Sequence, residues 1–186
     1  MLESTAIYTD YGKTKEIDKM GKMTERSLKE AFAGESQAHM KYLIFSEVAR
    51  KEGMENIARL FEGIAYAEKV HASNHARQLK MIGNTSDNLQ DALEGEDFEV
   101  HDMYPAYHAI AHIEEDKGAQ QSIHYALEAE KIHSSMYKDA QKVSKEGKDI
   151  ELGKLYVCPV CGFTHEGEPP AKCPVCGINS ERFKDF

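Results

Sequence analysis

The chain has 186 residues and a formal net charge of −9, and its 23 lysines and arginines are scattered rather than clustered. This length allows one domain of ordinary size and a small appendage. The acidic balance argues against a nucleic-acid partner, which needs a concentrated basic face. No apolar run approaches the ~20 residues that span a bilayer, and the N-terminus lacks a signal-peptide layout, so we expect a cytoplasmic protein without a membrane partner.

Four long helices are predicted after an N-terminal extension of residues 1–20. From Thr24 to Gly147 apolar residues recur at three- and four-residue spacing, and the only proline is Pro105. We expect helices at residues 24–52, 54–82, 86–117 and 119–146. Glycines are expected to stop or cap them: Gly53, Gly83, Gly118 and Gly147. The pattern predicts an all-α four-helix bundle over residues 21–148.

An internal repeat divides this helical region into two similar hairpins. Ala67–His71 returns as Ala129–His133, 62 residues later, and Gly34-Glu35 returns as Gly95-Glu96, 61 residues later. Neither hairpin can bury its apolar stripe alone, so the two are expected to pack about a pseudo-twofold axis. Matching residues of the two copies then meet at the centre.

Each predicted helix carries acidic or imidazole side chains in its apolar stripe. Buried carboxylates without a counter-charge cost many kcal/mol, and no lysine or arginine occupies these stripe positions, so metal cations are the expected counter-charge. Glu-x-x-His spacing places both side chains on one helix face. A glutamate from each of two helices plus Glu-x-x-His from the other two is the ferritin-like di-iron arrangement, with one extra glutamate here. The predicted ligands are Glu35, Glu68, His71, Glu96, Glu99, Glu130 and His133.

The charge of this ligand set favours redox use over a static structural role. Five glutamates are nearly balanced by two ferrous ions, or equally by two ferric ions with one oxide, so oxidation leaves the net charge unchanged. Zinc or manganese remain open, because ligand type alone does not exclude them. Tyr42 and Tyr104 follow ligand glutamates and are candidates to hydrogen-bond them; the alternative is core packing.

All four cysteines lie in the last part of the chain, in two Cys-Pro-Val-Cys-Gly segments. The pairs, Cys158 with Cys161 and Cys173 with Cys176, predict a tetrathiolate metal site in a separate domain of short strands and turns at residues 149–186. A structural zinc site uses the same spacing. We favour iron because a di-iron site must be supplied with two electrons, and a one-electron iron centre beside it could pass them on.

Together these motifs resemble those of rubrerythrins, across residues 23–186. The segments that carry the resemblance are Ala33–Ala38, Ala67–His71, Gly95–Glu99 with Met103–Pro105, Ala129–His133 and the two cysteine pairs. The resemblance implies a ferritin-like bundle followed by a rubredoxin-like domain. It also implies a peroxidase that reduces hydrogen peroxide to water in oxidative-stress defence. Electrons would pass from a rubredoxin or an NAD(P)H-dependent reductase through the iron held by the four cysteines.

The resemblance further implies a role for each ligand. Positions matching Glu68 and Glu130 bridge the two irons. Those matching Glu35 and Glu99 serve one iron, and those matching Glu96 and His133 serve the other. The position matching His71 replaces that of Glu99 when the site is reduced. We expect Glu99 and His71, which exchange in this pattern, to take part in catalysis, together with Tyr42 and Tyr104, which follow ligand glutamates in the sequence.

The link between the second and third predicted helices is short for a ferritin-like bundle. Such a bundle needs about 12 extended residues to run back along a helix of ~28 residues, and only about five are present. Either the bundle is simply up-down-up-down, or the hairpins separate and each pairs with a hairpin of a second chain. We favour the swapped homodimer. Two further functions stay open: a ferroxidase or iron-storage protein, and a zinc-binding scaffold without catalysis.

Overall fold

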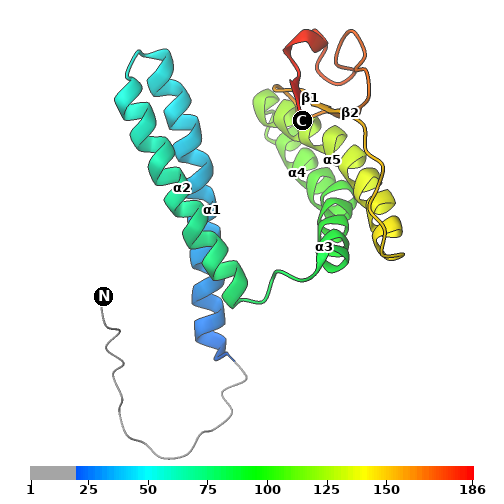
Figure 1. The fold of residues 1–186 in the computed structure, drawn as a ribbon. Helices are drawn as coiled ribbons and strands as arrows, with labels where there is room; N and C mark the ends of the chain where they lie inside the picture. Colours follow the sequence, from blue (N-terminus) through cyan, green and yellow to red (C-terminus); the bar gives the residue numbers. More distant parts are fainter. Residues whose placement is uncertain (1–19) are drawn as a thin grey trace, which may run out of the picture. The chain divides into compact units, whose positions relative to one another are not determined.

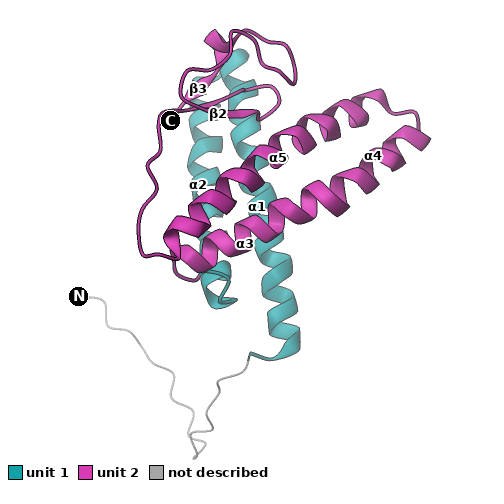
Figure 2. Cartoon of the chain, turned by 90° about the vertical axis from the view of Figure 1, so that its right-hand side faces the viewer, with its two compact units in different colours: residues 1–82 teal, residues 83–186 magenta. Residues whose placement is uncertain are grey.

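The computed structural model describes residues 20–186, so the predicted extension lies, except for its last residue, outside the described residues. The chain divides into two compact units, residues 1–82 and 83–186, which are described separately (Figures 1 and 2). The first unit is one helical hairpin. The second is another helical hairpin with the cysteine-rich region attached.

The hairpin of the first unit is formed by α1 (Lys22–Lys51) and α2 (Glu55–Gln78). Its buried residues are mostly small: Ser46, Ala49, Ala58, Ala65, Ala72 and Ala76. Small side chains let the two helices approach closely along this seam. The larger apolar residues of the predicted bundle stripe are exposed instead, among them Phe45, Ile57, Leu60 and Ile64. A single hairpin therefore leaves its apolar stripe uncovered.

The second hairpin contains a helix interrupted by a π-helical turn. This helix runs through α3 (Thr85–Phe98), the π-helical segment Glu99–Met103 and α4 (Tyr104–Ile113), and it packs against α5 (Lys117–Ser144). The sequence predicted one regular helix here, and the π turn was not foreseen. Such turns insert one extra residue and re-aim the side chains around them.

Two of the four predicted glycine stops are wrong. Gly53 and Gly147 do adopt positive φ at helix ends, but α2 and α4 end before Lys80 and Glu115, both with a φ of 57°. The sequence prediction favoured glycine because other residues rarely adopt this conformation. The helices that follow begin with side-chain caps: Asn84 accepts a hydrogen bond from the Asp87 N–H, and Asp116 accepts one from the Ala119 N–H.

The cysteine-rich region is built on a three-stranded antiparallel sheet of order β2-β1-β3. Its strands are β1 (Leu155–Val157), β2 (Thr164–Glu166) and β3 (Lys184–Asp185), and a 3₁₀ turn spans Ser180–Arg182. A Cys-x-x-Cys turn follows β1, and the second lies between β2 and β3. Gly162 and Gly177 close these turns at φ of 77° and 78°. Their N–H groups bond to the carbonyls of Cys158 and Cys173.

The predicted fold class is confirmed, since helical segments are followed by a small cysteine-rich region with short strands. Among the helices of residues 20–186, none combines the length and apolar character that crossing a membrane requires.

Candidate metal centres

The first unit brings together three of the predicted ligands. Glu35 comes from α1, and Glu68 and His71 come from α2; their ligand atoms lie within 4.8 Å of one another. His71 Nδ1 is 3.0 Å from Glu68 Oε2 and 3.9 Å from Glu35 Oε1. The imidazole side chain is 54% exposed, which leaves it room to move.

The second unit brings together the matching set from the other half of the repeat. Glu96 comes from α3, and Glu130 and His133 come from α5; these ligand atoms also lie within 4.8 Å of one another. His133 Nδ1 is 2.5 Å from Glu130 Oε2 and 4.0 Å from Glu96 Oε2. The His133 side chain is 28% exposed, about half the value for His71.

The electrostatics of this second set fit a cation. Burial, together with the neighbouring carboxylates of Glu130 and Glu99, raises the pKa of Glu96 to about 8. Its Oε2 is buried and has no hydrogen-bond partner among the described residues. A buried carboxylate oxygen without a donor is costly, and a metal ion satisfies it while supplying the missing positive charge. Two carboxylates and an imidazole nitrogen are a donor set that iron accepts.

Glu99 and Tyr104 lie beside the same carboxylates. Glu99 begins the π-helical segment and Tyr104 directly follows it. Burial raises the pKa of Glu99, and the Glu130 carboxylate adds to the effect. Burial likewise raises the pKa of the Tyr104 phenol, with contributions from Glu99 and Glu130. Both groups therefore hold their protons more strongly than in water.

Tyr42 has a different environment from Tyr104. Its ring packs against those of Phe45 and Phe61, each at a centroid distance of 6.2 Å. No hydrogen bond joins it to a ligand carboxylate within the described part of the chain. Its predicted catalytic role stays a prediction, and its visible role is aromatic packing in the first hairpin.

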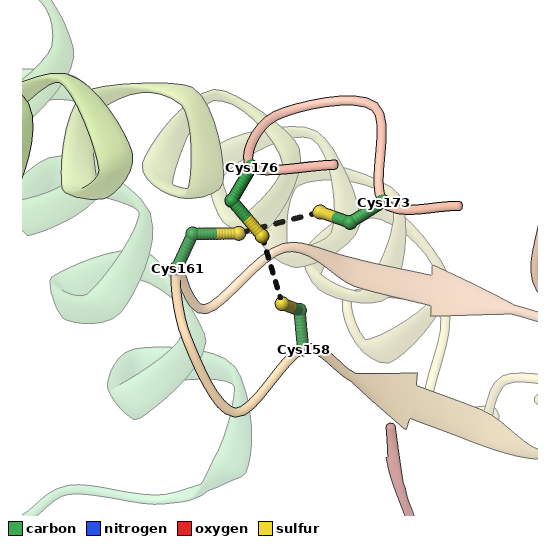
Figure 3. Close-up of side chains that lie close together, drawn as sticks. All are labelled: Cys158, Cys161, Cys173 and Cys176. Atoms are coloured by element: carbon green, nitrogen blue, oxygen red, sulfur yellow. Dashed lines mark hydrogen bonds between the residues drawn. The ribbon is translucent and has the colours of Figure 1, made fainter. Parts of the chain in front are cut away.

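The four cysteine sulfurs converge at the end of the small sheet, where the side chains point toward one another (Figure 3). Cys158 Sγ is 3.5 Å from Cys176 Sγ, and Cys161 Sγ is 3.4 Å from Cys173 Sγ. Burial alone would raise the pKa of Cys173, but N–H groups of Cys176 and Val175 lower it to about 7. Burial raises the pKa values of Cys161 and Cys176, so these thiols need the positive charge of a bound metal ion to ionise beside Cys173.

Two features near the second ligand set were missed by the sequence analysis. Thr164 Oγ1, at the start of β2, lies 2.9 Å from His133 Nε2. Ser134, next to His133, donates a 2.5 Å hydrogen bond to Asp97 on α3. Neither had a signal in the sequence, because both contacts depend on how α5 packs against other elements.

Comparison with known proteins connects these features to one family. A family model described as Rubrerythrin matches residues 27–141, and one described as "Rubrerythrin, rubredoxin-like domain" matches residues 156–184. Rubrerythrin-2 of Clostridium acetobutylicum is 47% identical, over 88% of this chain and 97% of that protein. Nigerythrin of Nitratidesulfovibrio vulgaris is 36% identical, over 88% and 86%. A solved structure of fully reduced, all-ferrous nigerythrin covers 97% of this chain and 95% of its own, with 31% identity and a TM-score of 0.51.

These matches confirm the predicted cofactors, a di-iron site in the helical region and an iron site of four cysteines. Of the three ligand clusters in the described residues, two consist of carboxylates and an imidazole and the third of the four cysteine thiols.

Proposed function

The chain belongs to the rubrerythrin family, and from this premise we propose that it is a non-haem di-iron peroxidase. It would reduce hydrogen peroxide to water in oxidative-stress defence, with electrons supplied through the tetrathiolate iron. The domains proposed for this function are a di-iron helical domain at residues 21–148 and a rubredoxin-like domain at residues 149–186. The cytoplasmic location stays a prediction.

The observation that carries the proposal is the packing of the cysteine-rich region onto α5. Tyr125 and Ile132 of α5 pack against the cluster formed by Cys158, Cys161, Cys173, Phe163 and Phe183. Ile132 directly precedes His133, a ligand of the other metal centre. The proposed one-electron site would therefore lie against the helix that carries a proposed di-iron ligand, within one compact unit, which suits an electron relay. A ferroxidase or a storage protein has no use for this arrangement.

We assign the irons to the residues that converge in the two units. Glu35, Glu68, His71, Glu96, Glu99, Glu130 and His133 would hold the iron pair, and the four cysteines would hold the third iron. When bound, the iron pair supplies the two electrons that cleave the O–O bond, and the tetrathiolate iron passes electrons one at a time. Solved structures of the relative nigerythrin capture it in partially reduced and in fully reduced, all-ferrous states.

The protein's own contribution to the reaction is the supply of protons. Each peroxide takes up two electrons and two protons to give two waters. Besides the effect of burial, Glu99 and Tyr104 lie close enough to the Glu130 carboxylate for it to raise the pKa of both groups, so they are placed beside the proposed ligands. We propose that these two groups deliver protons to the departing oxygen atoms. His71, exposed and held by Glu68, would take the ligand position that Glu99 leaves on reduction. Tyr42 remains a further candidate for proton transfer.

Peroxide turnover with an external reductase and rubredoxin tests this function. The iron-loaded chain should consume peroxide and oxidise NAD(P)H in equal amounts. Cys173→Ser, which removes one thiolate of the relay, should lose most of this coupled turnover, while chemically reduced protein should still react with one equivalent of peroxide. If the variant kept full coupled turnover, the relay would be wrong. A colourless protein with stoichiometric zinc in the cysteine site would instead favour the scaffold function.

We also propose that the di-iron site is assembled from two chains in a swapped homodimer. α2 has 24 residues and is therefore ~36 Å long, so a connection that runs back along it needs about 11 extended residues. Only residues 79–84 separate α2 from α3. Each hairpin holds one ligand set and leaves apolar stripe residues exposed, such as Leu60 and Ile110. A second copy supplies both the missing ligands and the apolar cover.

Complementation between two defective chains tests the swap. Glu68→Gln damages only the first hairpin and Glu130→Gln only the second, so neither homodimer should form an intact di-iron site. When the two variants are co-expressed in equal amounts and mix at random, about half of the dimers are heterodimers. Each swapped heterodimer regains one intact site, so about a quarter of all sites are intact. Without swapping, every site keeps one damaged half. If verified heterodimers contained no intact di-iron site, the proposal would be contradicted.

A further inference from the structure

The imidazole of His133 is held from both sides, and each side uses a different domain. Its Nδ1 faces Glu130 of the same helix, while its Nε2 is 2.9 Å from the hydroxyl of Thr164 in the cysteine-rich region. Thr164 is 8% exposed, so water does not compete freely for this contact.

The direction of this hydrogen bond follows from what lies behind the threonine. Thr164 Oγ1 is 3.0 Å from the carbonyl oxygen of Gly162, which can only accept. The one hydroxyl proton is therefore donated to Gly162, and the oxygen accepts from the N–H of His133 Nε2. Neutral histidine carries a single ring proton. With that proton on Nε2, the Nδ1 lone pair of the neutral ring is free for a metal ion beside Glu130 and Glu96; in the metal-free structure the 2.5 Å contact between Nδ1 and Glu130 Oε2 holds a further proton.

The first ligand set has no such support. His71 is the residue that matches His133 in the internal repeat, 62 positions earlier. It also bonds Glu68 through Nδ1, but no partner of its Nε2 occurs within the described range of the chain. The threonine contact is therefore specific to the half of the repeat that carries the cysteine-rich region.

From this geometry we propose that Thr164 is a positioning residue for the di-iron centre. Its hydroxyl, backed by the Gly162 carbonyl, fixes His133 in the tautomer and ring orientation that present Nδ1 to the metal. Gly162 directly follows the ligand Cys161, so the same short chain of contacts ties the first cysteine turn to the di-iron ligand. The two metal centres then share one structural support, and docking of the small domain prepares His133 for metal.

The inference rests on the metal role of His133 in the proposed function but not on the peroxidase reaction. Hydrogen bonds from a neighbouring group to the distal nitrogen of a histidine ligand set its tautomer, and their loss commonly costs about 10- to 100-fold in metal affinity. Thr164→Val removes the hydroxyl and keeps the shape of the side chain. Thr164→Ser keeps the hydroxyl and is the matched control.

The first test reads the tautomer directly by ¹⁵N NMR of the histidine rings in the full-length chain, with zinc in the cysteine site and no metal in the bundle. The spectra are recorded at a pH where the ring carries a single proton, and we expect His133 of the unmodified chain and of Thr164→Ser to carry it on Nε2. Thr164→Val should show a mixture of tautomers at His133 and no change at His71. A wild-type His133 protonated mainly on Nδ1 would overturn the proposal without reference to any variant.

The second test measures affinity for ferrous iron under anaerobic conditions in the same three proteins. Thr164→Val should bind the bundle iron that His133 ligates about 10- to 100-fold less tightly, and Thr164→Ser should stay within a few-fold of the unmodified chain. Zinc retention by the cysteines and thermal unfolding report whether the small domain stays folded. Equal affinity in all three proteins, or an equal loss in Thr164→Ser and Thr164→Val, would contradict the positioning role. A peroxidase assay plays no part, so this inference and the proposed reaction can fail separately.

Discussion

The two halves of the internal repeat begin from the same motif and provide different supports for it. In the first unit the Glu-x-x-His pair on α2 has an exposed histidine, and Val70 beside it is 41% exposed. In the second unit the position matching Val70 is Ile132, which packs against the cysteine-rich region. Duplication thus supplied two similar ligand sets, and the attached domain immobilised only one of them.

A second difference lies in how each hairpin is held together near its ligands. Asp97 and Ser134 form a hydrogen bond between α3 and α5. The matching residues of the first hairpin are Ser36 and Ala72, and Ser36 bonds only to the Phe32 carbonyl of its own helix. At these matching positions only the second hairpin has a side-chain hydrogen bond between its helices; the first hairpin is joined by a polar contact elsewhere, from His39 Nδ1 to the Ala65 carbonyl. A fixed set and a movable set would suit the ligand exchange that we propose for this site.

The largest effect expected from this comparison is on iron binding by the two histidines. His133→Ala should lose an iron from the bundle and reduce peroxide turnover by on the order of 100-fold or more, because it removes a fixed ligand. His71→Ala should keep both bundle irons and still turn over more slowly, about tenfold or more, because it removes the exchangeable ligand. Iron analysis and stopped-flow oxidation by peroxide measure the two effects. Equal iron loss in both variants would remove the distinction between the sets.

A smaller effect is expected in the pH dependence of the metal-free protein. The pKa of Glu96 is raised from 4.5 to about 8 in the folded chain, so the folded state binds a proton that the unfolded state releases. The stability that this proton contributes is fully present below about pH 4.5 and is lost as pH rises to about 8. Denaturant unfolding over this range should show the loss, and Glu96→Gln should flatten it. An identical pH profile for both proteins would mean that Glu96 titrates normally.

The smallest effect is expected from the polar contact between α3 and α5. Ser134→Ala leaves the Asp97 carboxylate without its donor and should lower the free energy of unfolding by about 1–2 kcal/mol. Ser36→Ala, at the position that matches Asp97 in the repeat, removes a bond within one helix and should cost less than about 0.5 kcal/mol. Denaturant unfolding of the metal-free variants gives both values. A larger loss for Ser36→Ala would reverse the assignment of the stronger contact.

The sequence predicted what depends on local spacing and missed what depends on packing between elements. Period and motif spacing located the helical segments and the residues that gather in the three ligand clusters, because ligands three residues apart on a helix share a face regardless of context. The ends at Lys80 and Glu115 were missed, since non-glycine residues at positive φ leave no compositional signal. The π-helical turn at Glu99 had no local signal either. Thr164 was invisible because its role arises only when β2 packs against α5.

The rates at which the fully reduced chain reacts with peroxide and with oxygen test the central claim most directly. Stopped-flow mixing of the iron-loaded, three-electron-reduced protein with each oxidant at equal concentration follows oxidation of the iron pair and then of the tetrathiolate iron. We expect faster oxidation by peroxide, followed by electron loss from the tetrathiolate iron. Faster oxidation by oxygen, accompanied by uptake of further iron, would contradict the peroxidase function and favour a ferroxidase.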